Sequence, residues 1–316
     1  MPESDPIHGC REELVVAVCT YRRPHGLVAL LNRLSAIEGR DRVIVLVVDN
    51  DPDRSAEQVV QDVNAQSGAG ALYMHAVPQG LATARNAALD FGGERSLAVL
   101  FIDDDEVPEP SWLTSMLSSH KKYPSAIITG PIRPEFAGPL PNWAPDGSFW
   151  RKPEYAAGQS LRVPTADANM LFPLKVTIGG QRFDTNFDLA GGQDTHFLLR
   201  WLAAKETILW SAQSVVVERI PEERLSLEYA RDRAYFSSIA YQHAVESVRG
   251  RRRAFDVLRI VRQRAISAFC WLYGKTASSA PMIARAQIRA AAARGTWAGM
   301  QGQWVNRWTD YQVDVR

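Results

Sequence analysis

The sequence predicts an α/β fold in which a doubly wound, mainly parallel sheet is followed by a helical C-terminal extension. Three apolar runs, at residues 14–19, 43–48 and 97–102, are rich in β-branched side chains, and each ends in a polar segment. Such runs are typical of strands that are buried on both faces of a parallel sheet. The stretches between them supply the helices of successive β-turn-α units.

The first half of the chain completes this pattern. Helices are expected at residues 27–34 and 55–64, and a short strand at residues 72–76 precedes an Ala-rich helix at residues 80–89. Ligands of such sheets bind outside the carboxyl ends of the strands. The polar segments at those ends, which we expect to converge on one crevice, are residues 20–23, 49–51 and 103–105.

The pattern loosens in the second half. The elements expected there are a helix at 111–119, strands at 126–130 and 168–173, a loop at 183–187 and a helix that starts near 191–194. Residues 131–164 are rich in Pro, Gly and Trp, which is typical of a long active-site loop. From about residue 225 to 294 the chain is predicted to be mostly helical.

Composition limits the class of protein. A chain of 316 residues, 46% hydrophobic and 22% charged, can build one large domain with an appendage or two modest domains. Cys10, Cys19 and Cys270 lie far apart without a CxxC pair, which argues against a disulfide framework or a zinc site. Because there is neither an apolar signal core nor an uninterrupted apolar run of about 18 residues, we expect a cytoplasmic protein, with peripheral contact at the inner face of the cytoplasmic membrane.

The segment Asp103-Asp104-Asp105 follows the third strong strand. Adjacent carboxylates repel one another, so something must compensate their charge. Mg²⁺ and Mn²⁺ favour oxygen ligands, and Mg²⁺ commonly takes one or two carboxylates together with substrate phosphates. The alternative is a solvated acidic turn that caps the next helix.

Three further positions have two interpretations each. Asp194 follows two glycines at a helix start, so it is either a general base or an N-cap. Arg85, at the start of the Ala-rich helix, is either a phosphate or nucleobase contact or an ordinary exposed Arg. Asp49 either accepts a hydrogen bond from a base or terminates its strand.

Several segments together resemble the family 2 glycosyltransferases with the GT-A fold, particularly the bacterial exopolysaccharide and capsule-type branch. The matching segments, in order across residues 14–230, are 18–24, 47–50, 80–86, 101–106 with 112–113, and 191–195. The resemblance implies a catalytic domain at 1–230, with a Rossmann-like nucleotide-sugar half at 14–110 and an acceptor half at 111–230. A helical, basic region at 231–316 would follow.

The resemblance also implies roles for individual residues. The residues assigned to the nucleotide sugar are Thr20, Tyr21, Arg22, Asp49, Arg85, Asp103, Asp104, Gln193 and Arg224. Asp105 and Asp103 would be the DxD acids that hold Mn²⁺ or Mg²⁺. For Asp104, a structural role is the alternative to a contact with the nucleotide sugar. Asp194 occupies the position of the inverting base. The implied reaction is a single displacement that transfers a sugar, most simply from a UDP-sugar, with inversion.

Two positions depart from the family pattern. The pair before the base is commonly Glu-Asp and is Gln193-Asp194 here; Gln cannot ionise, so Asp194 should be the base. A metal-binding His often follows, whereas the comparable strand end carries Glu218, which could supply an oxygen instead. Arg219 and Arg224 are then candidates for diphosphate contacts.

Residues 249–264 contain seven Arg and one Asp, and over residues 249–275 the Arg residues are interleaved with Val, Leu, Ile, Phe and Trp at roughly helical spacing. A basic amphipathic helix of this kind indicates an anionic membrane surface, which would suit a glycan or polyprenyl-diphosphate-linked sugar as acceptor. The alternative is an ordinary helix with a solvated basic face. No nucleic acid is expected, because no nucleic-acid-binding motif accompanies the cluster.

Two other functions compete with sugar transfer. A nucleotidyltransferase or pyrophosphorylase also combines such a sheet with acidic metal ligands, but it would generally carry a Gly-rich phosphate loop where this sequence reads TYRRP, at residues 20–24. The presence of Gln193 and the missing His leave open a catalytically degenerate sugar-binding module.

Overall fold

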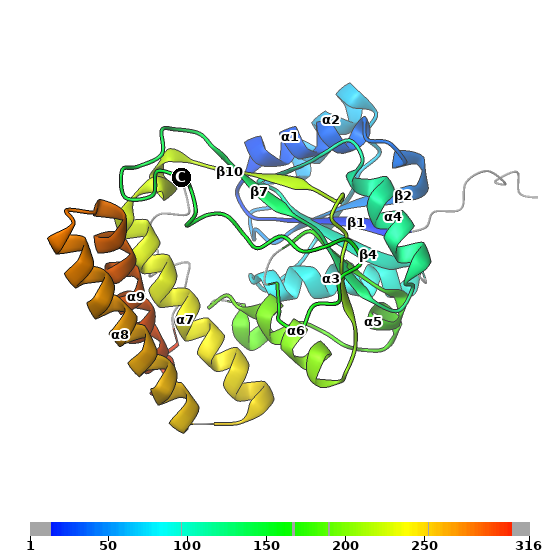
Figure 1. Ribbon diagram of the computed structural model, residues 1–316. Helices are drawn as coiled ribbons and strands as arrows, with labels where there is room; N and C mark the ends of the chain where they lie inside the picture. The colour runs from blue at the N-terminus through cyan, green and yellow to red at the C-terminus, as the bar shows by residue number, and fades with distance from the viewer. Residues whose placement is uncertain (1–13, 96, 166–167, 189, 252, 305–316) are drawn as a thin grey trace, which may run out of the picture.

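The computed structural model describes residues 14–95, 97–165, 168–188, 190–251 and 253–304, and its centre is a seven-stranded sheet flanked by helices (Figure 1). In spatial order the strands are β3 (Leu72–His75), β2 (Val43–Asp49), β1 (Leu14–Thr20), β4 (Ala98–Asp103), β8 (Met170–Phe172), β6 (Ile127–Thr129) and β9 (Ile208–Trp210). β3, β2, β1 and β4 run parallel, and β8 is antiparallel to both of its neighbours. The predicted doubly wound, mainly parallel α/β fold is therefore confirmed.

Burial on both faces explains why β1 is a strand. Leu14, Val16 and Val18 pack into one apolar cluster, while Val15 and Ala17 pack into another on the opposite face. The first face is covered by α1 (Pro24–Ser35), α2 (Glu57–Ser67) and α4 (Trp112–Lys122), and the second by α3 (Leu81–Glu94), α5 (Leu174–Ile178) and α6 (Gln193–Ala203). Because successive side chains of a strand point to opposite faces, a continuous apolar run is what this position requires.

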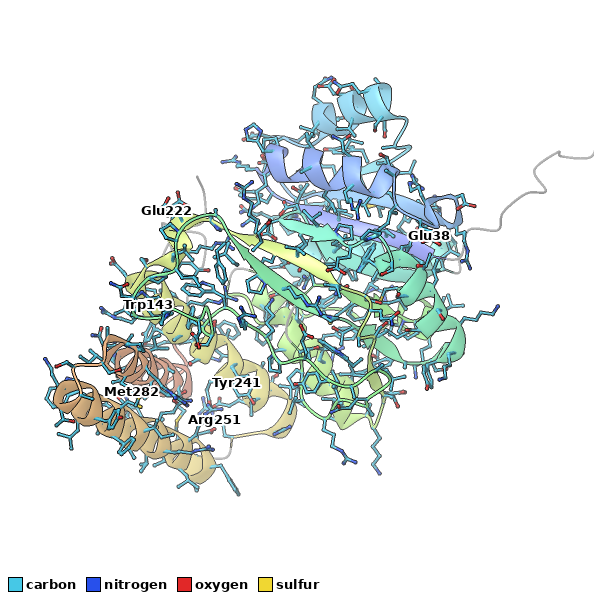
Figure 2. The ribbon with its side chains drawn as sticks, turned by 45° about the horizontal axis from the view of Figure 1, so that its top comes forward. Glu38, Trp143, Glu222, Tyr241, Arg251 and Met282 are labelled. Atoms are coloured by element: carbon cyan, nitrogen blue, oxygen red, sulfur yellow. The ribbon has the colours of Figure 1, made fainter. Side chains whose placement is uncertain are left out.

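A second, three-stranded sheet differs from the sequence prediction. It consists of β5 (Glu106–Pro108), β10 (Val216–Ile220) and β7 (Ile132–Phe136). Residues 131–164, predicted as one long loop, therefore begin with β7, which pairs in parallel with β10. Farther along, Trp143, Phe149 and Trp150 pack tilted or edge-on against one another and form an apolar cluster with Ile220 and Leu225, near Glu222 (Figure 2).

The C-terminal extension is helical, as the sequence predicts. It consists of α7 (Leu227–Arg249), α8 (Arg253–Thr276) and α9 (Ala280–Met300), and α9 packs against both of the others (Figure 1). Glycines allow α9 to approach α7 closely: a Cβ on Gly295 would lie 2.1 Å from the carbonyl oxygen of Tyr235. Among the described helices, none is long and apolar enough to cross a membrane.

Some sequence predictions concern residues outside the described part of the chain. Cys10 and Arg252 belong to this group, whereas Cys19 and Cys270 are described and are buried free thiols. Burial raises the pKa of Cys19 to about 12. α7 runs through the predicted domain boundary at residue 230, and the division into two halves with an extension stays a prediction.

Candidate active site

The polar ends of β1 and β4 open into a cleft of about 590 Å³, whose other walls come from α6, β10 and α7. Of the residues predicted for the site, the cleft is lined by Thr20, Tyr21, Arg22, Arg85, Asp103, Asp104, Asp105, Gln193, Asp194, Glu218 and Arg224. Asp49 is fully buried and does not line it, and of residues 49–51 only Asn50 does. The expected convergence therefore occurs for the ends of β1 and β4 and for β2 only through Asn50, and the cleft brings in residues more than 100 positions away in the sequence.

Asp104 joins the ends of two strands. Thr20 Oγ1 donates to Asp104 Oδ2 at 2.7 Å, and Arg23 Nη1 donates to Asp104 Oδ1 at 3.1 Å. Burial raises the pKa of Asp104 to about 6, a rise that the charge of Arg23 opposes. Both oxygens of this carboxylate accept hydrogen bonds from the chain itself, which ties the turn after β4 to Thr20 and Arg23. The predicted contact of Asp104 with the nucleotide sugar stays a prediction.

Asp103 and Asp105 face the cleft more openly, with 40% and 27% of their side chains exposed. Arg23 Nη1 donates to Asp105 Oδ2 at 2.9 Å. Partial burial raises the pKa of Asp103; the charge of Arg85 opposes this rise and that of Asp105 adds to it. The two carboxylates therefore form a site of concentrated negative charge that a cation would relieve.

Glu106 supports this turn from behind. Its Oε2 accepts the backbone N–H of Asp103 at 3.1 Å, and only 3% of the residue is exposed. Burial, and then the charge of Asp103, raise the pKa of Glu106 well above its ordinary value. Glu106 therefore fixes the backbone that presents Asp103 to the cleft.

Arg85 connects the acidic turn to the start of α6. The residue is only 2% exposed and lies near the rings of Phe101 and Phe183. Its guanidinium donates to Asp194 and, at 3.4 Å, to Asp103. Although burial would lower the pKa of Arg85, these two carboxylates outweigh that effect and raise it. Arg85 is thus a buried cation that holds Asp194 and Asp103 on one side of the cleft, and its predicted contact with a nucleotide stays a prediction.

The start of α6 places Asp194 without using it as a cap. The N-cap of this helix is Gly192, whose φ of 86° is left-handed and which makes no side-chain capping hydrogen bond. A Cβ on Gly192 would lie 2.9 Å from Cβ of Ala240, so the glycine also allows α7 to approach. Gln193 is buried, and its Oε1 has no hydrogen-bond partner among the described residues. Asp194 therefore reaches the cleft with its position set by Arg85.

Cations surround the opposite side of the acidic turn. Arg224 Nη1 lies 3.8 Å from Asp105 Oδ2 and 3.8 Å from Glu218 Oε1, and Lys152 Nζ lies 3.5 Å from Glu218 Oε2. Within the described ranges, no group of three or more His, Cys, Asp or Glu residues is arranged to hold a metal ion. Asp103 and Asp105 carry carboxylate oxygens, the type of ligand that Mg²⁺ and Mn²⁺ favour.

Of the residues predicted to contact the nucleoside, Tyr21 and Arg22 line the cleft whereas Asp49 does not. Asp49 accepts the backbone N–H groups of Asp51 at 2.9 Å and Ala56 at 2.8 Å, so it shapes the turn after β2. Tyr21 and Arg22 line the cleft, and Arg22 Nε donates to Asp51 at 3.1 Å. A contact of Asp49 with a nucleobase stays a prediction.

Several residues of the cleft were not predicted from the sequence. Lys152 comes from the segment interpreted as a loop, and its spacing carries no signal. Six more lie on α7: Tyr229, Arg233, Phe236, Ser237, Ala240 and Tyr241. Helical periodicity predicts α7, but it does not show that this helix would border the site.

Known proteins similar to this chain match it over most of its length. Residues 15–171, which extend from β1 to β8, match the family model described as glycosyl transferase family 2. The succinoglycan biosynthesis protein ExoM of Rhizobium meliloti is 32% identical over 259 residues, which are 81% of this chain and 82% of that protein. A glucosyl-dolichyl phosphate glucuronosyltransferase of Haloferax volcanii is 21% identical over 234 residues, 70% of this chain and 74% of that protein.

Solved structures share the fold. TarS residues 1–349 from S. aureus, in complex with UDP-GlcNAc, matches with a TM-score of 0.52 and 15% identity over 96% of this chain and 95% of that one. GalNAc-T7 with UDP, GalNAc and Mn²⁺ matches with a TM-score of 0.52 and 11% identity over 74% of this chain and 51% of that one. The relative at 32% identity decides the assignment, and the fold and the matched segment agree with it: this chain belongs to glycosyl transferase family 2, and it is a glycosyltransferase.

Proposed function

We propose that this glycosyltransferase inverts the anomeric centre while moving a sugar from a nucleotide sugar, with UDP-sugars as first choice, to a glycan or a polyprenyl-diphosphate-linked sugar. The observation that carries the proposal is the buried Arg85, which holds Asp194 and Asp103 on the same cleft. A role in exopolysaccharide biosynthesis is supported by the similarity to ExoM, a succinoglycan biosynthesis protein. The donor class is supported by the structures of TarS in complex with UDP and with UDP-GlcNAc.

The donor would lie across the ends of β1 and β4. Thr20, Tyr21 and Arg22 would border its nucleoside, together with Asp49 as the resemblance implies. Arg23, Arg224 and Lys152 provide positive charge beside Asp105 and Glu218. Cations in this position would offset the charge of a diphosphate.

Asp105 and Asp103 would hold Mn²⁺ or Mg²⁺, with Glu218 as a further oxygen donor after Arg224 turns toward the diphosphate. When bound, such an ion neutralises the negative charge that develops on the departing nucleoside diphosphate. Arg23 and Arg224 would also stabilise the negative charge of the diphosphate without the ion, because both guanidinium groups lie beside Asp105.

Asp194 would act as the general base. The acceptor hydroxyl oxygen attacks the anomeric carbon, its proton passes to a carboxylate oxygen of Asp194, and the bond to the diphosphate breaks with its electron pair leaving on UDP. Because bond formation and bond breaking occur on opposite faces, the configuration inverts without a covalent enzyme intermediate. Arg85 would orient the base for this transfer, as a third group orients the base of other catalytic sites. The acceptor hydroxyl would have to lie within hydrogen-bond reach of Asp194 in the complex.

The acceptor would enter from the side of α7. Tyr229, Phe236 and Tyr241 offer aromatic surface there, and Arg233 offers charge. A lipid-linked acceptor is supported by the name of the Haloferax relative, which specifies glucosyl-dolichyl phosphate. Such an acceptor would place the reaction peripherally at the inner face of the cytoplasmic membrane.

The test is UDP release from a panel of nucleotide sugars, measured with Mn²⁺, with Mg²⁺ and with a chelator. We expect release from at least one UDP-sugar that rises when the metal is added. Pyrophosphate exchange with a nucleoside triphosphate and a sugar phosphate would instead identify a pyrophosphorylase. Binding of a nucleotide sugar without turnover under any acceptor condition would identify a sugar-binding module, and either result would refute the proposal.

A further inference from the structure

The helix α8 has one packed face and one uncovered face. Its residues Asp256, Cys270 and Gly274 are buried, and a Cβ on Gly274 would lie 2.8 Å from Cγ1 of Ile283 on α9. Ser267 Oγ also donates to the carbonyl of Ala286 on α9, at 2.8 Å. α8 lies at the edge of the molecule, and it meets α9 through a turn next to Met282 (Figures 1 and 2). The face opposite α9 is therefore open to solvent.

The uncovered face is an apolar stripe. At spacings of three and four residues it carries Ala254, Leu258, Val261, Ala265, Ala268, Phe269 and Leu272, all exposed. Leu258 is 64% exposed, Phe269 66% and Leu272 60%. At 1.5 Å per residue the stripe is about 27 Å long. Scattered exposed apolar residues need no explanation, but a continuous stripe of this length along one helix marks an interaction surface.

Basic and aromatic residues border the stripe. Arg262 lies along one edge and Arg264 and Lys275 along the other, and all three are exposed. Trp271 and Tyr273, at 51% and 52% exposure, lie beside the same face. From residue 257 to 304 the sequence contains no Asp or Glu, and its basic residues there are Arg259, Arg262, Arg264, Lys275, Arg285, Arg289 and Arg294. The single acidic residue of α8, Asp256, is buried and lies 3.8 Å from Arg259.

We propose that this stripe, which we call the α8 face, lies on an anionic lipid surface. An exposed apolar face could be covered by a second copy of the chain or by a lipid surface, and the positive charge along the border of the α8 face distinguishes between the two. Two copies of the α8 face placed against each other would bring basic borders together without an exposed acidic partner on α8, which opposes a symmetric dimer. Anionic head groups complement the basic residues, while the apolar stripe enters the boundary between head groups and acyl chains and the aromatic rings lie at the interface.

The sequence predicts a basic amphipathic helix over residues 249–275, and the structure shows which of its residues form the uncovered apolar face, from Ala254 to Leu272. The contact also has a path to the cleft, since α7 lines the cleft and packs against α9, which carries α8. Binding of the α8 face to lipid does not require the proposed donor or acceptor, so it can be tested separately from the proposed reaction.

The test is co-sedimentation of the full chain with vesicles that contain neither donor nor acceptor. We compare vesicles of phosphatidylcholine with vesicles of phosphatidylcholine and phosphatidylglycerol. We expect binding to the anionic vesicles that weakens when salt is raised. Leu258→Glu with Phe269→Glu should reduce the partition coefficient by about tenfold or more, because two apolar contacts are lost and two like charges are added. Arg262→Gln with Arg264→Gln should reduce it by about 25-fold, at about fivefold for each basic residue.

The matched control is Val163→Glu with Ile178→Glu, which changes two apolar residues of 53% and 62% exposure outside α8. The control should bind vesicles like the unaltered chain, and circular dichroism should show that every variant is folded. Equal binding to neutral and anionic vesicles, or binding that the α8 variants do not alter, would overturn the proposal. A dimer that Phe269→Glu dissociates, without lipid binding, would assign the α8 face to a second copy instead.

Discussion

The contact between Arg85 and Asp194 can be measured directly by a double-mutant cycle. Arg85→Met keeps much of the side-chain volume and removes the charge, so that Asp194 is left in a site where only 13% of its side chain is exposed. Removing one partner of a buried ion pair costs about 3–5 kcal/mol, because the other charge stays buried without compensation. The second carboxylate, Asp103, is 40% exposed, so solvent screens that contact and we assign little of the cost to it.

The cycle compares Arg85→Met, Asp194→Asn and the double variant by urea unfolding. Each single change should destabilise the chain, and the double change should cost less than the sum of the two by about 2 kcal/mol or more. Arg85→Lys serves as the matched control, because it keeps a charge but cannot reach both carboxylates with one ammonium group. If the two changes add to within about 0.5 kcal/mol, the contact does not stabilise the chain and the role given to Arg85 is wrong.

Three other changes test separate parts of the structure. Asp105→Ala should weaken metal-dependent binding of UDP while leaving metal-independent binding in place, as calorimetry with and without Mn²⁺ would show; equal loss in both conditions would contradict the metal assignment. Burial lowers the pKa of His196 below 6.5, so the folded chain binds this proton less tightly than the unfolded chain and stability falls as pH drops through about 6.5. His196→Phe should flatten that decline in urea titrations between about pH 5 and 7, and an unchanged slope would contradict the assignment. Gly295→Ala should lower the free energy of unfolding by about 1–3 kcal/mol, since its Cβ would lie 2.1 Å from the carbonyl oxygen of Tyr235, and a neutral effect would refute this packing.

The central strands could be predicted because their burial is continuous. β1, β2 and β4 are apolar on both faces, and such runs need no knowledge of distant contacts. β5 and β7 have three and five residues and are partly exposed, so their sequence pattern is too short to distinguish them from loop. They form strands because β10, about 80–110 residues later, pairs with both.

The sequence predicts which residues line the cleft better than it predicts which residues they contact. The strand-end rule and the resemblance indicate Asp103, Asp105 and Asp194, and all three line the cleft. Neither source indicates that Arg85 turns inward, because its partner Asp194 is 109 positions away. The burial of Asp49 also depends on its hydrogen bonds within the following turn, which a strand-end position alone does not reveal.

The most direct test of the central claim is turnover of Asp194→Asn beside its equilibrium binding of UDP and metal. The substitution keeps the shape of the side chain and removes the carboxylate that would accept the proton of the acceptor. We predict that UDP binding stays within about twofold while transfer falls by about 10²–10⁴-fold, the usual contribution of a general base. Asp62→Asn, on the exposed side of α2, is the control and should transfer normally. Full transfer activity in Asp194→Asn would contradict the claim that Asp194 is the base of this glycosyltransferase.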